Sequence, residues 1–319
     1  MPVARVPLDV AVIMSTVLEG ILYGFSALMF IGTIWMFTYK HRMRDVNRPI
    51  AAVATLLLVL STAHIIVGII HLEDGLVKYR DTFPGGPAAF FAYAPQPTFV
   101  AKNAIYILQT LVGDGVVIYR CYVVWQSVWI IVIPCIMWCG VAACSVCMVY
   151  SFSQASISDV ENFFTSKLGH WVAAFLTSTL ATNVLSTGLL AYRIWMVERR
   201  VSAIRVTKGN MPILRVFIDA AIMYSAALCS SLICFALAND GLYVIGDVIN
   251  PIISIAFYMV FIRVATSRND KNYISTVGGG TTETERSTSQ RYPMNNTYRQ
   301  NDIPFLVDSP ELEGKRPVV

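Results

Sequence analysis

Two histidines, His64 and His71, interrupt the second long apolar stretch of the chain. A spacing of seven residues places them on one face of a helix, about 10 Å apart along its axis. Two ring nitrogens at that separation cannot hold one metal ion, so we expect no metal site and no cofactor here. We predict that His64 is a hydrogen-bonded interior residue and a candidate ligand contact, and that His71 lies at the membrane interface.

A polar stripe follows the last apolar stretch, where Asp247, Asn250, Ser254 and Tyr258 recur every three or four residues. This spacing lines them up on one face of a helix. Asn183, in the fifth stretch, lies at a depth similar to that of Asn250, and the two could share a polar cavity. Short polar side chains also serve as hydrogen-bonded contacts between membrane helices. The sequence therefore allows two interpretations, a ligand site that includes Asp247, Asn250 and Asn183, or helix packing.

Three ionisable residues are candidates for a conformational switch: Asp114, Arg120 and Asp219. Arg120 ends the third stretch and Asp219 begins the sixth, so an ion pair between them would lock two helices together at one membrane boundary. A ligand could bias such a lock. Alternatively, Arg120 extends to the lipid headgroups and Asp219 interacts with the N-terminal dipole of its own helix. Glu19 is expected to be shallow enough in the membrane to be hydrated.

These residues belong to a chain that is too apolar for a soluble protein. Of its 319 residues, 55% are hydrophobic and 14% are charged, whereas ordinary soluble domains are about 25% charged. This composition argues against a disordered protein, a nucleic-acid-binding module and most soluble enzymes. It favours a multi-pass membrane protein whose first partner is the lipid bilayer.

Seven apolar stretches have the length of about 20 residues that a helix needs to cross a bilayer. They cover approximately residues 18–39, 49–72, 99–125, 128–150, 170–197, 216–238 and 242–262. Unpaired backbone amides are too costly in hydrocarbon, and the ten-residue alternating pattern of a barrel is absent. We therefore predict an all-α membrane protein, a bundle of seven transmembrane helices.

Lys and Arg predict the orientation of this bundle, because they favour the cytoplasmic side. With the N-terminus outside, the inner segments hold 14 Lys and Arg residues and the outer segments hold 5, Lys102 among them. The predicted organisation is a short extracellular N-terminus at 1–17, a transmembrane domain at 18–263 and a disordered cytoplasmic tail at 264–319. We expect the plasma membrane as the location.

Two segments between the spans invite functional interpretations. The segment from Glu73 to Thr98 is rich in Pro, Gly and aromatic residues. It is either an irregular loop on the headgroups or a lid over an outward-facing pocket. The basic segment 198–215 is attracted to anionic lipids or docks a cytoplasmic signalling protein.

Several motifs resemble those of known families. The segments LEGILYG at 18–24, GDG at 113–115 and IYRCYVVW at 118–125 are similar to signatures of an uncharacterised family of seven-helix integral membrane proteins from mushroom-forming basidiomycete fungi. The resemblance spans about residues 15–265 and implies the fold and a fungal source, but no activity. The overall layout also resembles that of G-protein-coupled receptors, without the acidic residue before Arg120 or the usual Tyr after Asn250-Pro251.

Together these features predict a receptor-like protein that binds a small or lipidic ligand between its helices and signals to the cytoplasm. The alternative is a transporter or lipid-handling protein that uses the intramembrane polar residues as a substrate path. A third possibility is a structural membrane protein without a ligand. The last span has no Lys that could bind retinal, which argues against a retinal protein. We expect no enzymatic activity, because no His cluster of a metal-dependent lipid hydrolase reaches the last span, and His64 and the membrane serines do not form a convincing nucleophilic triad.

Overall fold

The computed structural model describes residues 8–39, 48–93, 95–155, 166–202, 212–239 and 241–286. Within these ranges the chain forms eight α-helices and no strand, and seven of the helices are long and apolar enough to cross a membrane. The prediction of an all-α, multi-pass membrane protein is thus confirmed. The helices are α1 (Leu8–Tyr39), α2 (Arg48–Glu73), α3 (Gly86–Ala92), α4 (Pro97–Trp125), α5 (Val128–Ser153), α7 (Lys167–Ser202), α8 (Pro212–Ala236) and α9 (Gly241–Arg286).

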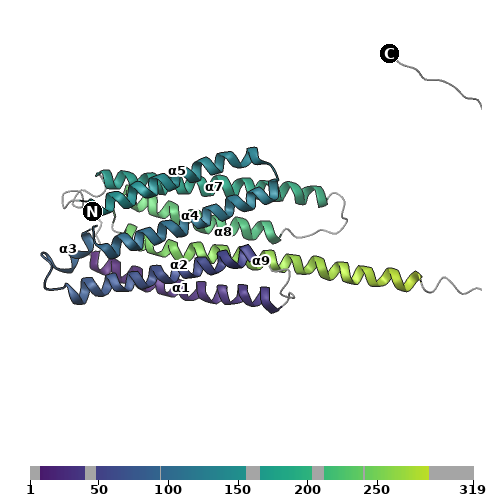
Figure 1. Ribbon diagram of the computed structural model, residues 1–319, viewed down its shortest axis with the longest axis horizontal. Coiled ribbons are helices and arrows are strands. Elements are labelled where there is room, and N and C mark those ends of the chain that lie inside the picture. The colour runs from purple at the N-terminus through teal and green to yellow at the C-terminus, as the bar shows by residue number, and fades with distance from the viewer. Residues whose placement is uncertain are drawn as a thin grey trace, which may run out of the picture. The chain divides into compact units, whose positions relative to one another are not determined.

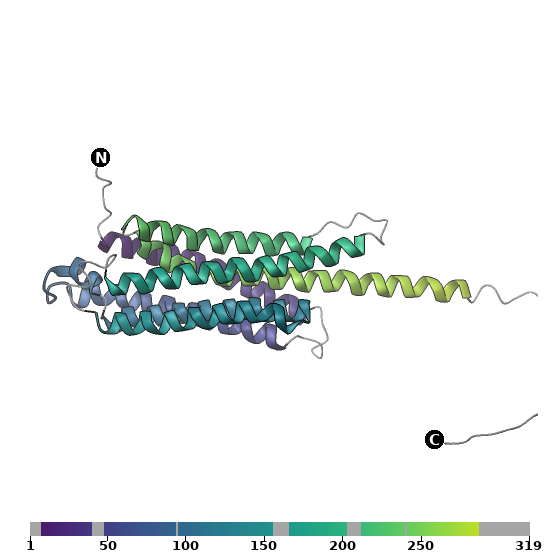
Figure 2. The same ribbon diagram turned by 90° about the horizontal axis from the view of Figure 1, so that it is seen from above.

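The seven long helices lie side by side, and the short helix α3 lies at one end of the bundle, hereafter the α3 end (Figure 1, Figure 2). Helix α4 contacts α2, α5 and α7. Two tryptophans fix it there, because Trp138 of α5 donates a hydrogen bond to the Leu111 carbonyl of α4 at 3.0 Å, and Trp125 of α4 donates to the Leu189 carbonyl of α7 at 3.1 Å. Helix α4 is therefore well placed to connect sites at different depths.

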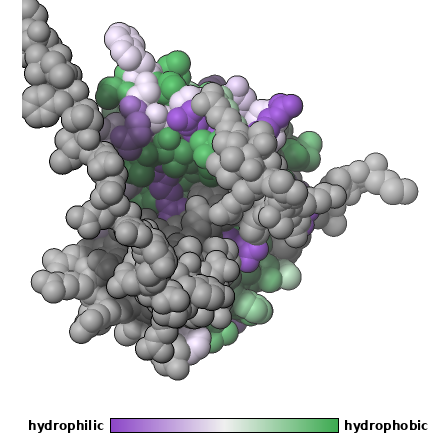
Figure 3. Space-filling model, turned by 90° about the vertical axis from the view of Figure 1, so that its right-hand side faces the viewer, coloured by the Kyte–Doolittle hydropathy of each residue, from purple (hydrophilic) through white to green (hydrophobic). Residues whose placement is uncertain are grey.

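The outside of the bundle is apolar, as expected where lipid replaces water. Large side chains such as Leu28 and Trp129 are exposed, whereas polar side chains such as Thr179 and Asn250 are buried. Figure 3 shows the end opposite α3, where hydrophobic and hydrophilic residues lie side by side on the coloured part of the surface. Because lipid is as apolar as Leu, the association of these helices depends on close packing and interhelical hydrogen bonds.

Two helix boundaries differ from those predicted. Helix α1 begins at Leu8 instead of residue 18, because the apolar sequence already starts there and Asp9 occupies the first turn, where the helix dipole favours a carboxylate. Residues 1–7 of the predicted N-terminal segment lie outside the described residues. Helix α9 extends to Arg286, so the first part of the predicted tail at 264–319 is helical, and residues 287–319 lie outside the described residues.

The chain divides into two compact units, Met1–Asp270 and Lys271–Val319. All seven candidate membrane spans belong to the first unit. The largest apolar core lies among α4, α5, α7, α8 and α9, and its fully buried members include Val141, Phe175, Leu228 and Ile249. The sites described below lie along this core.

Candidate functional site

The segment between α2 and α4 forms an ordered cap at the α3 end. After α2 the chain makes a π-helical turn, η1 (Asp74–Lys78), and then forms α3. Phe90 and Phe91 of α3 are buried against α1 and η1. A Cβ atom at Gly75 would lie 2.4 Å from the Phe91 ring, so only glycine allows this close approach. The segment thus contains two short helical turns that pack together.

His71 is enclosed by this cap. Its ring lies 5.5 to 6.0 Å from the rings of Phe90, Phe91 and Phe99, and its Nδ1 is 2.8 Å from the Thr98 hydroxyl. The side chain is only 4% exposed. His71 therefore connects the cap to the first turn of α4.

Four ionisable side chains and one serine form a charged cluster next to the cap: Glu19, His64, Lys102, Asp247 and Ser15. His64 Nδ1 lies 2.5 Å from Glu19 Oε1, and Lys102 Nζ donates to Asp247 Oδ2 at 2.7 Å. The Ser15 hydroxyl donates to the same Asp247 oxygen at 2.7 Å. The cluster thus joins α1, α2, α4 and α9.

The prediction that His64 is a hydrogen-bonded interior residue is confirmed, whereas two other expectations are corrected. Glu19 is 1% exposed and not hydrated, because it pairs with His64. Lys102 is 6% exposed and lies inside the bundle, not in an outer segment, because Asp247 provides its counter-charge. Both residues lie near span ends, where sequence alone suggests hydration.

Each carboxyl group of this cluster lies against a basic side chain. Glu19 pairs with His64, and Asp247 pairs with Lys102. Buried charges are tolerated when they are paired and hydrogen-bonded. Glu19 Oε2 is buried without a hydrogen-bond partner among the described residues. A Cβ atom at Gly68 would lie 3.4 Å from Lys102 Nζ and 3.8 Å from this oxygen, so Gly68 leaves the space between the two ion pairs open.

A cavity of about 110 Å³, hereafter the charged cavity, borders the cluster and extends under the cap. Its polar wall includes His64, His71, Lys102 and Asp247, and Phe91 of the cap also lines it. Two further lining groups, the hydroxyls of Tyr106 and Ser231, are buried and have no hydrogen-bond partner among the described residues. Most of the remaining wall is aromatic or aliphatic: Val12, Phe99, Met148, Phe152, Val172, Phe175, Leu176, Leu242, Tyr243 and Ile249.

The predicted polar stripe of α9 is buried against α1, α2 and α4. Asp247 belongs to the charged cluster, Ser254 lies 2.9 Å from the Ser61 hydroxyl, and Tyr258 donates to the Ala54 carbonyl at 3.1 Å. The prediction that these residues share one face is thus confirmed. Most of the stripe forms contacts between helices, and only Asp247 also lines a cavity.

Gln109 of α4 is the residue at this level that sequence reasoning missed. Its amide donates to the Asn250 carbonyl at 2.7 Å, to Ser254 at 2.9 Å and to Ser61 at 3.2 Å. Gln109 is fully buried and ties α2, α4 and α9 together. Gln109 does not stand in a regularly spaced run of polar residues like that of α9, so its spacing does not mark it. The side-chain amide of Asn250 itself is buried without a partner among the described residues.

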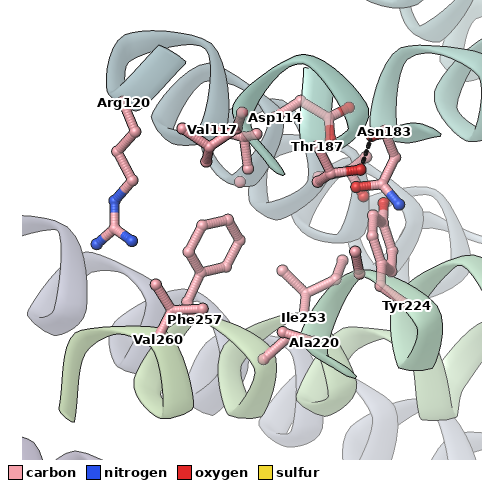
Figure 4. A pocket seen from close by; sticks show the side chains of 15 residues that line it. Asp114, Val117, Arg120, Asn183, Thr187, Ala220, Tyr224, Ile253, Phe257 and Val260 are labelled. Atoms are coloured by element: carbon pink, nitrogen blue, oxygen red, sulfur yellow. Dashed lines mark hydrogen bonds between the residues drawn. The ribbon is translucent and has the colours of Figure 1, made fainter. Parts of the chain in front are cut away.

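A second cavity of about 50 Å³, hereafter the Asp114 cavity, lies farther from the α3 end (Figure 4). Asp114, Asn183, Thr187 and Tyr224 gather at one end of it, and Arg120 lies at the opposite end. Asn183 is held in place, because its amide nitrogen donates to the Ser225 hydroxyl of α8 at 2.9 Å. Asn250 is not among the residues that line this cavity, so the predicted shared cavity for Asn183 and Asn250 is not found.

The structure does not join Arg120 and Asp219. None of the ion pairs identified within the described ranges joins these two residues, and Asp219 is exposed on α8. The Arg120 guanidinium lies 4.6 Å from the centre of the Phe261 ring of α9. Asp219 is the eighth residue of α8, which begins at Pro212 and has no acidic residue in its first turn, so the alternative interpretation, an interaction with the N-terminal dipole, is also not met. Of the three switch candidates, Asp114 and Arg120 share a cavity and Asp219 does not.

The candidate residues therefore separate into two sites. His64 and Asp247 meet in the charged cavity, and Asp114, Arg120 and Asn183 meet in the Asp114 cavity.

Within the described ranges, no group of three or more His, Cys, Asp or Glu side chains could hold a metal ion. Residues 203–211, which make up half of the basic segment 198–215, lie outside the described residues. Comparisons of the chain with protein-family models, with curated proteins and with solved structures found no match.

Proposed function

We propose that this seven-helix membrane protein is a receptor-like protein that binds a small organic ligand in the charged cavity. The observation that carries the proposal is the buried Lys102–Asp247 pair in the wall of an otherwise largely apolar, aromatic cavity. Ligand sites are typically concave and mostly apolar, with a few convergent polar groups that orient the ligand. The unpartnered hydroxyls of Tyr106 and Ser231 add two such groups.

The size of the cavity limits the ligand. An engineered apolar cavity of about 150 Å³ binds benzene, so a space of about 110 Å³ suits a small molecule or one group of a larger one. The aromatic walls favour an apolar body, and the ion pair favours a polar or charged end. Because Phe91 lines the cavity and belongs to the cap, movement of α3 would regulate access.

Signalling is supported by the way α4 and α9 connect the two cavities. Lys102 of α4 and Asp247 of α9 pair in the charged cavity. Farther along the same helices, Gly113 of α4 packs closely against α9, where an added Cβ would lie 3.1 Å from the Phe257 ring. A ligand that separates the ion pair shifts the two helices against each other, and the Asp114 cavity between them changes shape. Interfaces this closely packed switch between discrete arrangements.

The orientation is part of the proposal. Because Lys102 lies inside the bundle, four of the remaining Lys and Arg residues count as outer and 14 as inner when the N-terminus is outside. This excess supports an extracellular α3 end and a cytoplasmic C-terminus. In that orientation the ligand enters from outside, and the basic segment 198–215 meets the anionic leaflet and a cytoplasmic signalling protein. We further propose the plasma membrane as the location and kinship with the basidiomycete family that segments 18–24 and 113–125 resemble.

A ligand screen tests the binding proposal. The purified protein in lipid nanodiscs is screened by thermal unfolding against small aromatic and amphipathic molecules, and hits are retested on Asp247→Asn. We expect hits that raise the unfolding temperature of the wild type, because a ligand that binds only the folded state stabilises it. The Asp247→Asn variant should lose this response. Hits that stabilise both proteins equally would place binding outside the charged cavity.

The transporter alternative is favoured by one observation, the polar line from Asp247 to Tyr258 along α9. Uptake of a radiolabelled hit into sealed proteoliposomes separates the two functions. A receptor binds the hit without accumulating it inside, whereas a transporter accumulates it in a way that depends on Ser254 and Gln109. Accumulation would replace the receptor proposal with the transporter.

A further inference from the structure

The Asp114 carboxylate has a position that neither the sequence analysis nor the proposed function explains. The side chain is 4% exposed, and its Oδ2 atom has no hydrogen-bond partner among the described residues. The only other ionisable side chain in the wall of the cavity, apart from the phenol of Tyr224, is Arg120. Six residues separate the two along α4, which is about 9 Å along the helix axis. Arg120 lies at the far end of the cavity and contacts Phe261 (Figure 4).

A buried carboxylate with an unpaired oxygen is costly, so we expect it to take up either a proton or a cation. The groups around Asp114 are oxygen atoms that suit a cation. The hydroxyl of Tyr224 on α8 is buried and also lacks a partner among the described residues. Asn183 of α7 uses its nitrogen on Ser225, which leaves its carboxamide oxygen for the cavity. Thr187 lies at the same end (Figure 4).

We propose that the oxygens of Asp114, Asn183 and Tyr224 form a binding site for a monovalent cation, with sodium as the probe. Hard cations prefer carboxylate, carbonyl and hydroxyl oxygens. A single carboxylate balances one positive charge, and the described part of the chain brings no second acidic side chain into this cavity. The volume of about 50 Å³ holds the ion with a few waters, because one water needs about 10–15 Å³ of such space.

The bound cation would tie three helices together, since Asp114 lies on α4, Asn183 on α7 and Tyr224 on α8. The site would therefore stabilise one arrangement of these helices. This inference does not rest on the ligand proposal, because it uses none of the residues of the charged cavity. If the ligand screen fails, the cation site is unaffected. If the sodium experiment fails, the ligand proposal is unaffected.

Thermal unfolding in nanodiscs at constant ionic strength and pH, with sodium chloride exchanged for choline chloride, tests the site. We expect the unfolding temperature of the wild type to rise saturably with sodium, and Asp114→Asn to remove this rise. Asp219→Asn is the matched control, since it neutralises an exposed carboxylate two turns into α8 and should keep the full sodium response.

Tyr224→Phe provides a second variant that keeps the charge and removes one oxygen. It should raise the half-saturating sodium concentration about tenfold, which corresponds to one lost polar contact. Direct binding of radioactive sodium to the wild type checks the site even if Asp114→Asn does not fold. Equal unfolding of the wild type in sodium and choline, or an unchanged sodium response in Asp114→Asn or Tyr224→Phe, would overturn the proposal. If Asp114 only takes up a proton, the wild type should unfold at the same temperature in sodium and in choline.

Discussion

At the scale of single residues, most polar side chains described inside this bundle have an identified hydrogen-bond or ion-pair partner. A few buried polar atoms have no hydrogen-bond partner among the described residues. Lys102 and Asp247 satisfy each other at 2.7 Å, and Gln109 connects to three oxygens on two neighbouring helices. Sequence reasoning identified Asp247 as polar and interior but could not identify Lys102 as its partner. Pairing depends on how α4 and α9 are rotated about their axes, and one sequence does not specify that rotation.

The buried ion pair leads to a prediction about Lys102. Lys102→Met should lower the free energy of unfolding by about 3–5 kcal/mol, because it leaves the Asp247 carboxylate buried and uncompensated. The double variant Lys102→Met with Asp247→Asn should recover most of that loss. Denaturant unfolding in mild detergent measures both. Equal stability of Lys102→Met and the wild type would show that the pair is solvated and does not belong to a dry cluster.

Gln109 offers a second test at this scale. Gln109→Leu keeps the approximate volume but removes the donor to Asn250 and Ser254, and we expect a loss of about 1–3 kcal/mol in unfolding free energy. Gln126→Leu is the control, because Gln126 donates only to the Val123 carbonyl at the end of its own helix, at an exposed site. If both variants lose the same stability, Gln109 does not connect the helices.

At the scale of elements, hydropathy predicted the seven spans well because membrane thickness sets their length. The differences lie at helix ends, where a helix continues beyond the predicted apolar stretch, as in α1 from Leu8 and α9 to Arg286. The cap was harder to predict, since neither its Pro and Gly content nor its aromatic residues show that α3 packs onto η1. That packing depends on the missing side chain at Gly75, whose importance is visible only beside Phe90 and Phe91.

The cap is tested by Gly75→Ala. The added methyl group would overlap the Phe91 ring, so α3 must move, at a cost of about 1–3 kcal/mol for overpacking. Hydrogen exchange should accelerate over residues 74–92 and remain unchanged in α5. Gly140→Ala is the control, because nothing lies within 4 Å of a Cβ atom there. Unchanged exchange over the cap in Gly75→Ala would contradict the packing described.

At the scale of the whole molecule, the low charge content follows from the seven apolar spans. The excess of Lys and Arg in the segments counted as inner predicts the orientation of the bundle. Sequence reasoning could assign charges to sides but placed Lys102 outside, because a lysine near a span end looks hydrated. The structure moves Lys102 into the bundle, and the remaining excess supports a cytoplasmic C-terminus more strongly. It also shows two separate sites along α4 where the sequence suggested one shared cavity.

Orientation is tested with a protease-cleavable tag at either terminus of the protein in intact cells. The N-terminal tag should be removed by external protease, and the C-terminal tag only after permeabilisation. A cytoplasmic marker protein that stays intact controls for leakage. External removal of the C-terminal tag would invert the orientation and place the charged cavity on the cytoplasmic side.

The central claim is that the charged cavity binds a small ligand, and filling that cavity tests it most directly. Gly246 lines the cavity and nothing lies within 4 Å of its Cβ position, so we expect Gly246→Leu to occupy part of the cavity. Gly140→Leu adds the same side chain on α5, at a position that is also open and lines none of the cavities described. The decisive measurement is the rise in unfolding temperature that a screening hit produces in each variant. The account predicts a full rise in Gly140→Leu and none in Gly246→Leu, and an equal rise in both would contradict it.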